Sequence, residues 1–152
     1  MGEYTRTENV FAIAADFHRR LGTIYQNLTK DADQKRVKLF LDYLNRHEKR
    51  FAEALERYDQ DMQDKIKNTW YQYVPAEETL STEGIQLDEN MDIDQVLQAA
   101  LEMDNRLIRF LQRLADNVGA PYETREVFQA MVEQQKQEKR DLLQSAQDLK
   151  KL

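Results

Sequence analysis

Apolar residues recur at steps of three and four along four stretches of this chain, which is the spacing of one buried helical face. The pattern predicts helices over about 6–29, 32–67, 93–117 and 122–150. The short turns within the first pair and within the second pair of helices predict two antiparallel hairpins. The sequence therefore indicates an all-α protein.

Three of the four expected helices are preceded by a capping signal. A Thr or Asp stands three residues before a Glu or Gln at Thr5–Glu8, Asp31–Gln34 and Asp92–Gln95. In such a box the first side chain caps the helix and the fourth reaches back to the first backbone N–H. The signals predict helix starts just after residues 5, 31 and 92.

Each apolar stripe is interrupted by polar residues near its middle. The interruptions are His18, Glu48, Asp104 and the pair Gln135 and Glu138. His18 and Glu48 are 30 positions apart, and Asp104 and Gln135 are 31 apart, so both hairpins direct polar groups at one shared interior. Interior polar groups are costly unless they are paired, protonated or bound to a ligand. We therefore expect these side chains to converge in one hydrogen-bonded network, and we treat them as the candidate site.

The segment between the two hairpins, about 69–91, loses the helical pattern and contains Trp70, Tyr71 and Tyr73. Some 20 extended residues, at about 3.3 Å each, can cross a bundle from end to end. The aromatic residues favour a crossover that packs on the bundle, because a loose aromatic loop is costly to solubility. The alternative is an up-down-up-down bundle with a loose loop. In either case we expect one domain over 1–152.

Composition supports long amphipathic helices, since 33% of the residues are charged and only four are Gly and two are Pro. The absence of Cys excludes disulfides and iron–sulfur clusters. A net charge of −6 gives no reason to expect nucleic-acid binding. No apolar stretch reaches the length of a membrane span, and the N-terminus lacks the pattern of a signal peptide. We expect a cytoplasmic protein with neither a nucleic acid nor a membrane as its partner.

The helix layout, with the phrases LFLDYLNRHEKRFAEAL and ALEMDNRLIRFLQRLA, resembles the rubrerythrin/ferritin-like superfamily. The resemblance covers nearly the whole chain apart from the crossover, and layout carries it rather than an intact motif. It implies a ferritin-like four-helix bundle, two antiparallel hairpins joined by a long crossover. In that family a Glu from each of two helices and a Glu-x-x-His from each of the others hold two metal ions.

In the first hairpin, the resemblance places one residue of the expected type. Glu48 stands where the second helix supplies its Glu. His18 stands where the first Glu belongs, with Tyr25 seven residues later as in many relatives. The His expected after Glu48 is replaced by Phe51, which cannot coordinate a metal.

In the second hairpin, every expected ligand has changed. Asp104 stands in place of the third-helix Glu, Gln135 in place of the fourth-helix Glu, and Glu138 in place of its His. Both Glu-x-x-His motifs are therefore broken. His47 lies about 100° around the helix from Glu48, so we expect it at the boundary with solvent rather than among the ligands.

Three interpretations follow. The first is a ferritin-like protein that has lost its di-iron site and any cofactor, and that serves as a structural or interaction module with a second copy of itself or another protein. The alternative is a metal-binding oxidoreductase or metal-storage relative in which His18, Glu48, Asp104 and Glu138 hold a single Fe, Mn or Zn ion. The third is a small-ligand binder that uses the same pocket. The sequence leaves enzymatic activity open and favours its absence. A His such as His18 on an apolar face is most often a hydrogen-bonded core residue.

Overall fold

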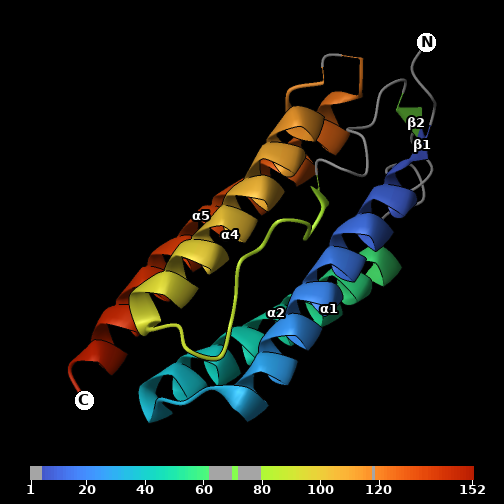
Figure 1. Cartoon of the computed structure of the whole chain (residues 1–152). Helices are drawn as coiled ribbons and strands as arrows, with labels where there is room; N and C mark the ends of the chain where they lie inside the picture. Colours follow the sequence, from blue (N-terminus) through green and yellow to red (C-terminus); the bar gives the residue numbers. More distant parts are fainter. Residues whose placement is uncertain (1–4, 62–69, 72–79, 118) are drawn as a thin grey trace.

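The computed structural model describes residues 5–61, 70–71, 80–117 and 119–152. Their four long helices are α1 (Thr7–Asp31), α2 (Lys35–Asp61), α4 (Ile93–Ala115) and α5 (Tyr122–Lys150). A two-residue strand β1 (Thr5–Arg6) pairs antiparallel with β2 (Trp70–Tyr71). The helices form a bundle of two hairpins (Figure 1), so the all-α prediction is confirmed.

The predicted helix bounds hold for α5 and shift by a few residues elsewhere. α1 continues to Asp31, and α2 begins only at Lys35. The predicted box at Asp31–Gln34 is therefore wrong, because Asp31 is still helical. α4 ends two residues earlier than expected, and the expected extension of α2 to residue 67 lies outside the described residues.

The other two capping signals have different outcomes. Thr5 lies in β1 and α1 begins at Thr7, one residue later than the first box requires. The box before α4 is confirmed: the backbone N–H of Gln95 donates to Asp92 at 2.9 Å, and the backbone N–H of Asp92 donates to the Gln95 side chain at 3.0 Å. α4 therefore has the well-defined start that its sequence predicts.

Contacts at one end of the bundle show how the helices run relative to one another. Arg36 at the start of α2 donates to the carbonyl of Lys150 at the end of α5, at 3.2 Å. The Lys150 ammonium lies 2.9 Å from a carboxylate oxygen of Asp94, at the start of α4. α2 and α4 thus start at the same end and run parallel (Figure 1). The up-down-up-down alternative is wrong.

The connection between the hairpins crosses the bundle lengthwise. At one end, β2 pairs with the strand just before α1. At the other, the carbonyl of Glu89 accepts a hydrogen bond from the N–H of Asp33, in the turn after α1, at 3.3 Å. These points are separated by the 25 residues of α1, about 37 Å of helix. Positions 69 and 72–79 of the predicted segment, Tyr73 among them, lie outside the described residues, whereas Leu80 beyond them is fully buried.

Two arginines fasten the described part of the crossover to the helices. Arg20 of α1 donates to the carbonyl of Leu80 at 3.5 Å. Arg106 of α4 donates through Nη1 to the carbonyls of Ser81 and Glu83, both at 2.7 Å. Because each bond has a charged donor, it is stronger than an ordinary backbone contact.

Replacing Arg106 with Ala should lower the free energy of unfolding by about 1–3 kcal/mol, because two crossover carbonyls lose a charged donor. Arg109→Ala is the matched control, since Arg109 is exposed on the same helix and approaches Glu102 only at 3.9 Å. The control should change stability by less than about 0.5 kcal/mol. Urea unfolding of both variants measures the difference. Equal losses would show that the Arg106 contacts do not hold the crossover.

The buried face of α4 is wide. Val96, Met103 and Phe110 are buried along with Ala100 and Leu107, whereas Leu97 and Leu101 are only half-buried. The crossover contributes to this wide buried surface, because Met103 lines a surface pocket with Ile85 and Met91. α4 therefore packs against both the other helices of the bundle and the crossover, which requires a wide apolar surface.

Candidate functional site

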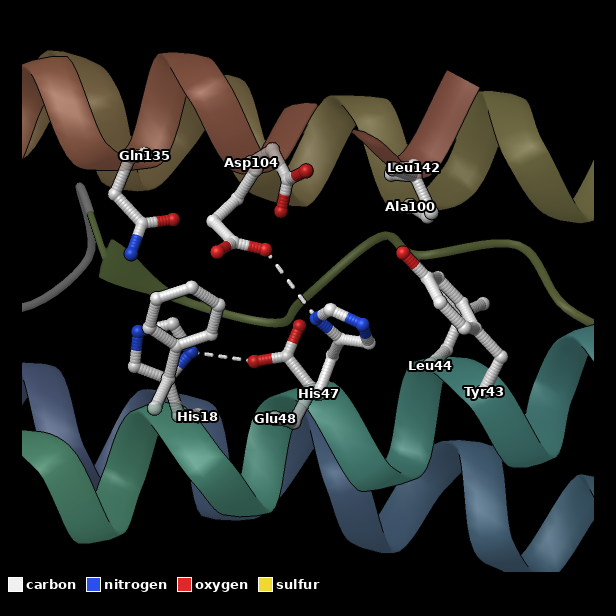
Figure 2. Close-up of a pocket in the computed structure, with 11 residues that line it drawn as sticks. His18, Tyr43, Leu44, His47, Glu48, Ala100, Asp104, Gln135 and Leu142 are labelled. Carbon is white, nitrogen blue, oxygen red and sulfur yellow. Dashed lines mark hydrogen bonds and ion pairs between the residues drawn. The ribbon is translucent and has the colours of Figure 1, made fainter. Parts of the chain in front are cut away.

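The five candidate residues lie close to the middle of their helices and come together between the hairpins. They line one pocket of about 20 Å³, room for about one water molecule. The members of this group are His18, Glu48, Asp104, Gln135 and Glu138. Figure 2 shows His18 of α1 and Glu48 of α2 facing Asp104 and Gln135 across the interface between the two hairpins. The predicted convergence at mid-bundle is confirmed.

The innermost contact joins the two helices of the first hairpin. Nδ1 of His18 donates a hydrogen bond to Oε2 of Glu48, and both side chains are buried. Gly22 lies beside this pair: a Cβ there would lie 3.5 Å from Cβ of Glu48, an ordinary contact, and 3.3 Å from Oδ1 of Asn45, a tighter one. In the neutral tautomer that carries its proton on Nδ1, the other ring nitrogen, Nε2, is a hydrogen-bond acceptor. That Nε2 is buried and has no hydrogen-bond partner.

Phe51 covers the imidazole of His18. The two rings are stacked, with centroids 5.1 Å apart and an interplanar angle of 18°. Phe51 stands three residues after Glu48, where the resemblance implies a metal-binding His. Under that resemblance, an apolar ring against His18 stands where a ligand is expected, an arrangement that the sequence identified only as a missing donor.

Asp104 is placed among other acidic groups. Burial raises the pKa of its carboxyl well above the ordinary value, and the charges of Glu48 and then Glu138 act in the same direction, while Lys139 opposes them. Tyr25 is fully buried, and burial followed by the charges of Glu48 and Asp104 raises the pKa of its hydroxyl. The middle of the bundle thus disfavours further negative charge.

A second pair lies nearer to solvent. Nδ1 of His47 is 3.3 Å from a carboxylate oxygen of Glu138, and the His47 side chain is 23% exposed, at the boundary where the sequence placed it. Burial raises the pKa of Glu138, while His47 lowers it. Tyr43, which the sequence analysis missed, packs its ring 4.2 Å from that of His47. Its position four residues before His47, on the same helix face, was the available signal.

The polar groups do not form the single network that was expected. The described contacts make two separate pairs, His18 with Glu48 and His47 with Glu138. Asp104 lies between them in the same pocket. Over the described ranges, no three His, Asp or Glu side chains are grouped closely enough to hold a metal ion. The site as arranged offers hydrogen bonds and an unpartnered imidazole nitrogen.

Comparison of the chain with protein-family models, with curated proteins and with solved structures gives no significant match. The resemblance to the rubrerythrin/ferritin-like superfamily therefore stays a prediction from the helix layout and the site positions. In the part of the chain that the structure describes, no helix is long and apolar enough to cross a membrane.

Proposed function

We propose that this protein is a ferritin-like four-helix bundle that has lost the di-iron centre and works as a structural or interaction module. The parallel α2 and α4 and the lengthwise connection support the ferritin-like assignment, because such bundles use one long crossover. Its partner is a second copy of the chain or another protein. Leu39 on α2 and Leu143 on α5 are exposed apolar side chains available for that contact.

The observation that carries the loss of the metal centre is the His18–Glu48 pair covered by Phe51. The one carboxylate of the family type, Glu48, accepts a hydrogen bond from the residue at the first ligand position. Phe51 fills the next ligand position with an apolar ring. Two metal ions bridged by carboxylates need more donors than these residues supply.

A site for a single metal ion is the second candidate function, and the composition of the pocket favours it. Glu48, Asp104 and Glu138 line the same small pocket, and burial, followed by the charges of Glu48 and Glu138, raises the pKa of Asp104. One Fe, Mn or Zn ion would neutralise that charge, with His18 as a nitrogen ligand. This function requires His18 or Glu48 to leave its present hydrogen bond.

Elemental analysis of the purified protein separates the two candidates. We expect no stoichiometric pair of irons and no ferroxidase or peroxidase turnover, because the ligand set is too small. Two irons per chain would overturn the proposal, and one tightly bound ion would establish the single-ion site.

A restored ligand tests the family assignment separately. Phe51→His recreates the Glu-x-x-His spacing with Glu48 and should give measurable binding of Zn or Mn, detected by titration calorimetry. Phe51→Leu is the matched control and should behave as the wild type. Absence of metal binding in a folded Phe51→His variant would argue against a ferritin-like register.

A further inference from the structure

A larger, mostly apolar cavity adjoins the polar pocket. Its volume is about 230 Å³, and it lies between the two hairpins. All four helices contribute apolar side chains to its wall, including Phe11, Leu55, Leu107, Leu111 and Met131. An engineered cavity of about 150 Å³ with such a lining binds benzene. The cavity here has room for a ring with a short alkyl substituent.

One end of the cavity is polar. His18, Phe51 and Gln135 line both this cavity and the polar pocket. His18 is only 2% exposed, yet its Nε2 has no hydrogen-bond partner. The amide of Gln135 is directed toward the imidazole from α5 (Figure 2). An unpartnered buried ring nitrogen beside an apolar space is costly, and a ligand with one hydroxyl group would satisfy it.

The charges around that end select the head group of the ligand. Glu48, Asp104 and Glu138 are carboxyl groups of the adjoining pocket, so an anionic head would meet repulsion. A hydroxyl group is neutral, donates to an imidazole nitrogen, and accepts from the amide of Gln135. In the neutral tautomer of His18 that donates from Nδ1 to Glu48, Nε2 is the acceptor.

We propose that this cavity binds a small neutral molecule with an apolar body and one hydroxyl group, such as a short-chain alkylphenol. The hydroxyl donates to Nε2 of His18, and the body lies among the apolar side chains of the four helices. The entrance lies on α5, where the lining residues Ala130 and Gln134 are exposed. This binding is independent of the partner contact proposed above.

Titration calorimetry with three probes that share a 4-ethylphenyl body tests which head group the cavity prefers. 4-Ethylphenol should bind, 4-ethylanisole should bind about tenfold more weakly because it lacks the donor, and 4-ethylbenzoate should bind more weakly still. Equal affinity for the phenol and the anisole, tightest binding of the benzoate, or no binding of the phenol would each overturn the proposal.

Two variants of α5 locate the binding site. Ala130→Phe places a ring at the entrance and should abolish binding of 4-ethylphenol. Gln137→Phe is the matched control: it lies on the same face of α5, about 10 Å away, and is not among the residues of the cavity. It should bind the phenol as the wild type does. Unchanged binding by a folded Ala130→Phe variant would overturn the location.

The two histidines provide a direct readout of the contact. In nitrogen-15 spectra, the Nε2 signal of His18 should shift upfield when 4-ethylphenol is added, because its lone pair accepts a hydrogen bond. His47, which does not line the cavity, should stay unchanged. A shift at His47 alone would place the phenol elsewhere and would contradict the assignment of Nε2.

Discussion

Replacing His18 with Leu is expected to lower the free energy of unfolding by about 3–5 kcal/mol, because it leaves the carboxylate of Glu48 buried without a partner. Both side chains are almost fully buried, so bulk solvent does not reach the carboxylate to replace the lost hydrogen bond. The double variant His18→Leu/Glu48→Leu removes both polar groups and should recover most or all of that loss. Replacement of a buried pair by apolar residues is often neutral or stabilising.

Glu48→Gln completes this series. The amide oxygen still accepts from Nδ1 of His18, and a buried charge disappears, so stability should stay within about 1 kcal/mol of the wild type or rise. Thermal unfolding of all variants, with and without a chelator, measures the differences. A chelator-sensitive wild type that loses its sensitivity in Glu48→Gln would show that the pair binds a metal, contrary to the proposed function.

Asp104→Asn is expected to raise stability at neutral pH by about 1–3 kcal/mol, the range for a buried polar group that lacks compensation. Burial and the neighbouring carboxylates raise the pKa of Asp104 in the folded state. The folded protein therefore holds this proton more tightly than the unfolded chain does. The stability that comes from the protonated carboxyl of Asp104 is fully present below the unfolded pKa of about 3.9. This stability is lost as pH rises through the folded pKa.

The pH dependence provides the measurement. Between acidic and neutral pH, the advantage of Asp104→Asn over the wild type should increase with pH, as determined by urea unfolding at several pH values. Asp42→Asn is the control, because Asp42 is exposed on α2 and pairs only with Arg46 in the next turn. Its difference from the wild type should stay small throughout. A constant advantage for Asp104→Asn would mean that this carboxyl does not titrate abnormally.

The helices and their pairing could be predicted because they depend on local periodicity. The box at Asp92 fixed one helix start, whereas the similar signal at Asp31 failed because α1 continues through it. The matching spacing of the polar positions was enough to predict that His18, Glu48, Asp104 and Gln135 lie in one pocket.

The hydrogen-bond pattern inside the site could not be predicted from spacing. Which acid pairs with which imidazole depends on side-chain directions that no periodicity encodes. Tyr43 was missed because a tyrosine on a half-buried face has many ordinary roles. The apolar cavity was also missed, since it is a product of how two hairpins fit together and not of any single helix.

The division of the bundle into two hairpins has a consequence for the order of folding. α1 packs mainly on α2 and α4 mainly on α5, so each hairpin consists of contacts between residues close in sequence. Such contacts form quickly, while those between the hairpins must wait for a longer loop to close. The His18–Glu48 bond belongs entirely to the first hairpin and can form early. Asp104 and Gln135 reach it only when the hairpins dock, so the pocket and the cavity are created in the last step of folding.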